Sequence, residues 1–293
     1  MPMPQNSSTN TPPPDQGSSR PPAIQVVDLF PETLDALLEL LTGLSPEDWQ
    51  RPTVCAGWSV KDIAAHLLGG EFGILSRKRD GYAFAGSPFI EWDALVALIN
   101  DLNDAWVKAT RRLSPQLLCD LLRFAGGQTN RYFAALDPDA LGDPVDWAGP
   151  GPAPVWLDLA REYTERWHHQ QQIRDATDHP GLKAPRYLAP VLDAFVRALP
   201  HTYRDVQAAD GSSVTLEITG AAGNRWHLLR EGGAWQLYLD ADATPTASVS
   251  LDEDLAWRLF TKGVKPEAAR ARVRVSGAER LALPALGMIS IIG

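Results

Sequence analysis

The hydrophobic period of this chain changes near residue 184, and that change restricts the folds open to it. Before this point apolar residues recur at intervals of three and four, as in Leu34, Leu37 and Leu41, which is the spacing of an amphipathic helix. After it, short segments such as 214–218 alternate apolar and polar residues, as half-buried strands do. The sequence therefore predicts the fold class α plus α+β, in which a helical domain precedes a smaller domain with a sheet.

Long helices joined by loops are expected in the first part, and they indicate an antiparallel bundle. Proline is tolerated at a first helical position, so one helix opens at Pro31. Ser59 followed by Asp62 approximates a capping box that starts another. Five prolines and three glycines between residues 137 and 154 favour an irregular loop. The remaining long helices are expected over 89–113, 114–136 and 155–178.

Three segments divide the chain. Residues 1–22 are rich in Pro, Ser, Asn, Thr and Gln, and we expect them to form a disordered leader. The helical bundle then occupies residues 23–183, and a small α+β domain occupies residues 184–293. Its expected elements are helices over 188–199 and 252–262, strands over 214–218, 225–230, 235–239, 247–251 and 272–275, and a hairpin turn at Glu231-Gly232-Gly233.

Charge and cysteine content exclude several classes of function. The net charge of −9 argues against sequence-independent binding of nucleic acid, which needs basic surface. No apolar run is long enough to cross a bilayer, and the N-terminus lacks the pattern of a signal peptide. Cys55 and Cys119 have no metal-type spacing and cannot form a disulfide framework. We therefore expect a cytoplasmic protein that binds neither nucleic acid nor membrane.

Two segments carry candidate metal ligands. Glu165 and His169 are spaced i, i+4, which places a carboxylate and an imidazole on one face of a helix. His66 lies on a different helix, from which it can point at that face. Two nitrogens and one oxygen are the ligand set of a divalent metal that keeps a coordination position open for chemistry. His168, three residues from Glu165, is the alternative to His169, but the four-residue spacing stacks better.

A less specific interpretation of these residues stays open. His66 alone would more often be a satisfied core histidine than a ligand, and Glu165 with His169 could form a surface pair. If the pair faces inward, however, the buried carboxylate needs a cation or strong donors. Zinc suits a nitrogen-rich site best, with nickel, cobalt, manganese and iron as alternatives.

Both segments resemble motifs of the mycothiol-dependent maleylpyruvate isomerase family, part of the DinB-like group of metal-binding four-helix proteins. Trp58-Ser-Val-Lys-Asp-Ile-Ala-Ala-His66-Leu67 is similar to the first-ligand motif, and Glu165-Arg-Trp-His-His169 is similar to the Glu-x-x-x-His motif. The run from 247 to 275 resembles the appended α+β domain, which is related to sterol-carrier folds. The resemblance implies a four-helix bundle in which His66, Glu165 and His169 hold a divalent metal, commonly zinc.

The chain departs from the family pattern at one position. The family often has Asp where this chain has Gln172, so a negative charge beside the ligands is missing. The resemblance also implies an arginine from the smaller domain for a dicarboxylate substrate. Several arginines of that domain are candidates, and most are more simply surface residues: Arg225, Arg230, Arg258, Arg272 and Arg274.

The expected activity is metal-assisted thiol chemistry on a small electrophile, with mycothiol or a similar low-molecular-weight thiol as cosubstrate. A thiolate that adds and leaves gives isomerisation, and one that stays attached gives S-transfer. His168, beside a ligand, is the candidate catalytic proton shuttle. Two alternatives stay open. One is a metal-dependent hydrolase, and the other is a non-catalytic metal-containing binding or sensor protein whose tryptophans stack on an apolar ligand.

Overall fold

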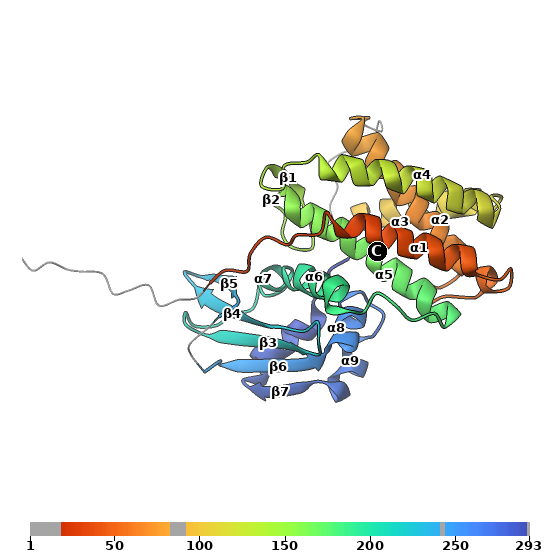
Figure 1. The fold of residues 1–293 in the computed structure, drawn as a ribbon. Helices are drawn as coiled ribbons and strands as arrows, with labels where there is room; N and C mark the ends of the chain where they lie inside the picture. The colour runs from red at the N-terminus through yellow and green to blue at the C-terminus, as the bar shows by residue number, and fades with distance from the viewer. Residues whose placement is uncertain (1–18, 83–91, 241–243, 292–293) are drawn as a thin grey trace, which may run out of the picture.

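The computed structural model describes residues 19–82, 92–240 and 244–291. The expected start of a helix at residue 89 and most of the expected leader lie outside these residues. The chain forms a helical domain and a smaller domain built on a sheet (Figure 1), which confirms the expected fold class. The long helices are α1 (Leu29–Gly43), α2 (Val60–Ile74), α3 (Trp92–Thr110), α4 (Pro115–Ala134) and α5 (Val155–Thr177), with short turns η1 (Asp48–Gln50) and η2 (Leu75–Arg79).

Local capping signals fix where two of these helices begin. The Ser59 hydroxyl accepts a hydrogen bond from the Asp62 amide, and the Asp62 carboxylate accepts one from the Ser59 amide. This reciprocal pair confirms the expected capping box and starts α2. Ser114 caps α4 through the Leu117 amide, ahead of Pro115 at the first helical position. Both helices therefore begin where the sequence predicts.

Four helices enclose the core of the first domain. α1 packs on α4, α4 on α2, α2 on α5, and α5 on α1, so the contacts close a ring. α3 packs on α2 outside this ring. The core between the helices contains leucines that recur at helical spacing, and Leu41, Leu68, Leu118 and Leu122 are buried there. The arrangement is a four-helix bundle with one additional helix.

The loop expected between residues 137 and 154 contains a short sheet, so that expectation is wrong in part. β1 (Leu141–Pro144) pairs antiparallel with β2 (Pro152–Pro154), with an irregular register. Prolines cannot donate ladder hydrogen bonds, which keeps such a ribbon very short. Val145 and Trp147, between the two strands, are buried and join the core. Burial of these two side chains explains why the segment is ordered despite its composition.

The second domain is built on a five-stranded mixed sheet of order β5-β4-β3-β6-β7, in which only the described pair β3 and β6 is parallel. Gly232 and Gly233 adopt positive φ angles of 56° and 79° in the turn between β4 and β5, as an expected tight hairpin requires. The elements are α6 (Pro185–Val196), α7 (Leu199–Thr202), β3 (Ser213–Thr219), β4 (Arg225–Glu231), β5 (Ala234–Tyr238), β6 (Ala247–Asp252), α8 (Glu253–Phe260), α9 (Pro266–Ala269), η3 (Arg270–Arg272), β7 (Arg274–Gly277), α10 (Glu279–Ala282) and η4 (Leu283–Gly287).

One apolar core joins the two domains. Tyr163 and Trp167 of α5 belong to the same buried cluster as Phe195 of α6 and the inner face of the sheet. Trp167 meets Trp257 of α8 edge to face, with ring centroids 5.4 Å apart. The segment after η4 returns to this seam, where the Ser290 hydroxyl donates to the Phe195 carbonyl. The division near residue 184, just before α6, stays a proposal.

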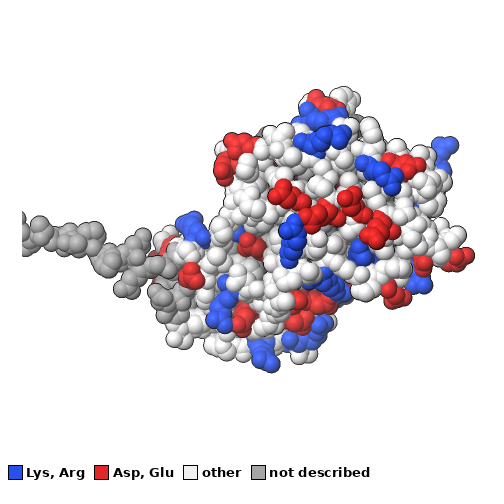
Figure 2. Space-filling view, in the orientation of Figure 1, with Lys and Arg blue, Asp and Glu red and all other residues white. Residues whose placement is uncertain are grey.

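Residues 19–22, which the sequence assigns to the leader, are described and attached to the second domain. The Ser19 hydroxyl donates to Asp240, and Arg197 donates to the carbonyls of Pro21 and Pro22. No helix in the described ranges is long and apolar enough to cross a membrane. Acidic and basic side chains are mixed over the face seen in Figure 2.

Candidate metal centre

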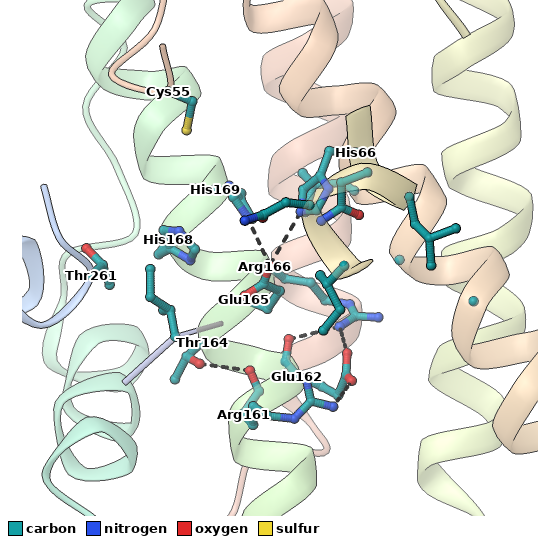
Figure 3. A pocket seen from close by; sticks show the side chains of 18 of the residues that line it. Cys55, His66, Arg161, Glu162, Thr164, Glu165, Arg166, His168, His169 and Thr261 are labelled. Carbon is teal, nitrogen blue, oxygen red and sulfur yellow. Dashed lines mark hydrogen bonds and ion pairs between the residues drawn. The ribbon is translucent and has the colours of Figure 1, made fainter. Parts of the chain in front are cut away.

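The three candidate ligands lie together between α2 and α5. The capping box starts α2 at Val60, which carries His66 to the face opposite Glu165 and His169 of α5. Glu165 Oε1 lies 3.0 Å from His169 Nε2 and 3.4 Å from His66 Nε2. One ligand atom from each of the three residues lies within 4.8 Å of the others, and Figure 3 shows their side chains converging.

These distances fit a divalent cation. Ligand atoms about 2.1 Å from a tetrahedral zinc lie roughly 3.4 Å from one another. The separations from Glu165 Oε1 are close to that spacing. The side chains of both histidines are largely buried, whereas Glu165 remains one-third exposed. The donor set is that of a site with an open position.

Gln172 orients one of the ligands. Its Oε1 lies 2.7 Å from His169 Nδ1, and because an amide oxygen only accepts, His169 donates its Nδ1 proton there. The Nε2 lone pair is then directed at the candidate ion. The Cys55 thiol also donates to Gln172 Oε1, at 3.4 Å. The neutral amide thus occupies the position where the resemblance implies a carboxylate.

The electrostatics of the site favour the protonation states that a cation needs. Burial lowers the pKa of His66, and the neighbouring His169 adds to this effect. Burial alone would raise the pKa of Glu165, but His169 and a hydrogen bond from His66 hold it well below its usual range. At neutral pH the carboxyl is therefore ionised and the His66 ring is neutral, as metal ligation requires.

His168 lies beside the three ligands but points away from them (Figure 3). Its ring centroid is 4.0 Å from that of His169, and the residue is 2% exposed. Burial lowers its pKa to about 3, with a further contribution from His169. The ring is therefore neutral near pH 7.

A cavity of about 800 Å³ contains the candidate ligands and His168. Its walls come from the segment before α2, from α2, α3 and α5, and from the second domain. Both Trp58 and Trp147, two of the ten tryptophans, line it. Apolar side chains form much of the lining: Trp58, Leu67, Ile74, Tyr82, Ile99, Leu102, Trp147 and Ile291.

A buried ionic network, which the sequence analysis missed, lies next to the site on α5. Glu162 pairs with both Arg161 and Arg166. Arg166 also donates to Glu71 at 2.9 Å, and Arg161 donates to Asp158 at 2.8 Å. Two helical spacings were local signals for it: i, i+4 for Glu162 and Arg166, and i, i+3 for Asp158 and Arg161. Each arginine therefore has two carboxylate partners.

The second domain contributes no arginine to the described cavity wall. Arg258, one of the five candidates, pairs with Asp175 and Asp254 and stacks over Trp257 at 4.2 Å. Arg225, Arg230, Arg272 and Arg274 also lie outside the cavity lining. The expectation of a substrate-contacting arginine from this domain stays a prediction, and none of the five candidates is among the described lining residues. The domain instead supplies Thr261, Lys262, Ser290 and Ile291.

A protein-family model matches the helical domain of this chain. Residues 30–174 match the family model described as mycothiol maleylpyruvate isomerase N-terminal domain, and this range includes all three candidate ligands. A crystal structure of a histidine-to-alanine variant of the mycothiol-dependent maleylpyruvate isomerase is similar over 87% of this chain and 93% of that chain. The identity is 12% and the TM-score is 0.50, which shows a shared fold.

Two further structures are less similar. A crystal structure of the mycothiol-dependent maleylpyruvate isomerase matches at 12% identity and a TM-score of 0.48, over 82% of this chain and 88% of that chain. The solution structure of the sterol carrier protein domain 2 of Helicoverpa armigera matches at 14% identity and a TM-score of 0.25, over 36% of this chain and 91% of that chain. No curated protein sequence matches this chain.

Proposed function

Through its helical domain the chain belongs to the mycothiol-dependent maleylpyruvate isomerase family, and on that premise we propose that it is a metal-dependent enzyme that uses a low-molecular-weight thiol. The proposed cosubstrate is mycothiol or a similar thiol, and the second substrate is a small electrophile. The proposed ion is zinc, and the proposed location is the cytoplasm. Both cysteines are free thiols, in keeping with a reducing compartment.

The single observation that carries this proposal is the convergence of His66, Glu165 and His169 at the wall of a large cavity. A divalent cation held there would act as a Lewis acid that favours the deprotonated form of a thiol. Only three protein ligands converge among the described residues, so the set leaves room for a substrate atom.

The residues of the chain prepare this site in distinct ways. Glu165 supplies the negative charge, and the His66 and His169 rings supply one nitrogen ligand atom each. Gln172 holds the orientation of His169. Apolar side chains form much of the wall around the reacting groups. His168 is the proposed catalytic group that exchanges a hydrogen bond with the reacting molecules, acting as a neutral imidazole.

The proposed reaction begins when the thiol loses its proton and the sulfur forms a bond to an electron-poor carbon of the electrophile. The electron pair of the carbon–carbon double bond moves to the conjugated carbonyl, and the former double bond can rotate. If the carbon–sulfur bond then breaks, the double bond reforms as the other isomer. If a proton is returned to carbon instead, the product is a thioether.

The experiment measures loss of the free thiol and isomerisation of the electrophile in parallel. Metal-loaded protein is mixed with mycothiol and either maleylpyruvate or 1-chloro-2,4-dinitrobenzene. The proposal predicts turnover that requires both the metal and the thiol, is lost in His66→Ala and persists in His179→Ala, whose side chain is exposed on the loop after α5. Turnover of an ester without any thiol would instead identify a hydrolase. Absence of turnover, with tight binding of an apolar molecule that survives metal removal, would identify a binding protein.

A further inference from the structure

A tight turn over residues 53–58, just before α2, is fixed by its own hydrogen bonds. The Trp58 amide donates to the Cys55 carbonyl, and both the amide and the hydroxyl of Thr53 donate to the Trp58 carbonyl. The Cys55 amide donates to the Thr53 hydroxyl at 3.2 Å. Gly57 adopts a φ of 79°, which glycine tolerates at no steric cost. The backbone of the turn therefore determines where its side chains lie.

This turn contacts the surroundings of both candidate histidine ligands. The ring centroid of Trp58 lies 5.3 Å from that of His66. The Cys55 thiol donates to Gln172 Oε1 at 3.4 Å, and the same oxygen accepts the Nδ1 proton of His169 at 2.7 Å. An amide oxygen has two lone pairs and can accept both protons. Cys55 therefore touches the residue that orients His169.

A molecule in the cavity can reach one of the two cysteines of the chain. Cys55 is half-buried and lines the cavity, and its sulfur points toward His169 in Figure 3. Cys119 is 2% exposed and packs among the apolar side chains between the bundle helices. The two thiols should therefore differ strongly in their reaction with a molecule that enters the cavity.

Trp147, on the wall of the same cavity, independently points to a bound molecule. It is 4% exposed, and its indole Nε1 has no hydrogen-bond partner in the described part of the chain. An indole N–H can only donate, and a buried donor without a partner is costly. An acceptor oxygen on a molecule in the cavity would pair with it. The wall that carries the Cys55 thiol is therefore suited to a ligand with a carbonyl oxygen.

The proposed function, on which this argument rests, brings a small electrophile to this wall together with a thiol. Burial raises the pKa of Cys55, and the nearby Glu165 carboxylate adds to this effect. At neutral pH the group is therefore a protonated thiol, which is a weaker nucleophile than a thiolate held at the ion. The cosubstrate thiol should react first, and Cys55 should react with the electrophile that remains.

We propose that Cys55 is an alkylation site for electrophiles that the cosubstrate thiol does not consume, and that its alkylation weakens binding of the ion. The Cys55 sulfur forms a bond to the electron-poor carbon of a conjugated double bond, and the thiol proton ends on the neighbouring carbon. No oxidant is needed and no group leaves. The resulting thioether has no proton to donate to Gln172, and the added group takes up space beside this amide. His169 then loses the partner that fixes its orientation.

The first test uses N-ethylmaleimide, an activated alkene with two carbonyl groups, on metal-loaded protein. Mass spectrometry of peptides locates the label and gives the rate at each cysteine. The proposal predicts that Cys55 is labelled at least about tenfold faster than Cys119 in the folded protein, because Cys119 is buried. Both cysteines should be labelled in urea, which controls for the reactivity of the reagent.

The second test measures the affinity for zinc by competition with a chelator, before and after labelling. Labelled wild type and labelled Cys119→Ala should both bind zinc about tenfold more weakly than the untreated proteins. Treatment of Cys55→Ala should leave its affinity unchanged. In Gln172→Ala the amide that links the two groups is already absent, so labelling of Cys55 should change the affinity less than about twofold.

The proposal is overturned if Cys55 stays unlabelled in the folded protein, if labelled wild type keeps its zinc affinity, or if Gln172→Ala loses as much affinity on labelling as wild type does. Failure of the proposed function gives a different result. If labelling weakens zinc binding as expected but no mycothiol is consumed in the turnover assay, the alkylation site stands and the thiol chemistry is wrong. If mycothiol is consumed but Cys55 is not labelled, the reverse holds.

Discussion

The His169 imidazole donates its Nδ1 proton to the Gln172 amide oxygen across 2.7 Å, one turn along the helix that carries both residues. The contact is buried and leaves Nε2 facing Glu165 and His66. The amide orients the ring through this hydrogen bond and adds no negative charge beside the ligands. The orientation of one ligand therefore depends on a residue that does not touch the ion.

Replacement of this amide should weaken the site without removing a ligand. We expect Gln172→Ala to lower the affinity for zinc about 10- to 100-fold, because the imidazole loses the partner that fixes its tautomer. Competition with a chromogenic chelator measures the affinity. Gln171→Ala is the matched control, since this buried glutamine donates to the Gly181 carbonyl on another face of α5. Equal zinc affinities in the two variants would contradict a role for Gln172 in orienting His169.

The ionic network beside the site should matter for stability. Glu162→Gln removes the carboxylate shared by Arg161 and Arg166. We expect a loss of about 3 kcal/mol in the free energy of unfolding, near the low end for breaking a buried pair because each arginine keeps one other partner. Urea denaturation measures this free energy. The control is Glu47→Gln at an exposed position, whose free energy of unfolding should stay within about 0.5 kcal/mol of wild type.

The same carboxylate predicts a pH dependence. Burial alone would raise the pKa of Glu162, but Arg161 and Arg166 together lower it below its ordinary value of 4.5. A lowered pKa means that the folded state binds this proton less readily than the unfolded chain. The stabilisation is therefore present above pH 4.5 and is lost as the pH falls through the pKa of the folded state. In Glu162→Gln the free energy of unfolding should fall less steeply as the pH drops below 4.5. The same fall in the variant and in wild type would contradict a stabilising role for the ionised Glu162.

Replacement by alanine should have opposite effects on stability at two adjacent glycines of α2. A Cβ at Gly69 would lie 2.7 Å from Nε1 of Trp106, whose ring is held by a hydrogen bond to the Ala65 carbonyl. Gly69→Ala should destabilise the protein by about 1–3 kcal/mol through overpacking. Gly70→Ala meets open space and should stabilise it by about 0.5–1 kcal/mol. Thermal unfolding of the two variants measures the difference, and equal midpoints would refute the packing of α3 on α2.

Local sequence signals were sufficient for much of the fold. Ser59 with Asp62 marked the start of α2, and the spacing of Glu165 and His169 placed both on one face of α5. Gly232 and Gly233 marked the hairpin of the sheet. Each of these features depends on residues within about four positions of one another, which is the range that periodicity and capping patterns describe.

Contacts between distant segments could not be predicted in this way. Cys55 reaches Gln172 from the segment before α2, and Thr261 and Ser290 reach the cavity from the second domain. Their positions depend on how the domains pack, which no local period encodes. The ribbon of β1 and β2 was missed because its prolines and glycines give a loop signal, while burial of Trp147 holds it in place.

The metal content of purified variants shows whether His66 and His169 bind an ion. Wild type, His66→Ala, His169→Ala and the exposed-loop control His179→Ala are purified in parallel, and bound metal is measured by inductively coupled plasma mass spectrometry. We expect close to one equivalent of metal in wild type and His179→Ala, and at least tenfold less in His66→Ala and His169→Ala. Full metal content in both His66→Ala and His169→Ala would contradict this expectation.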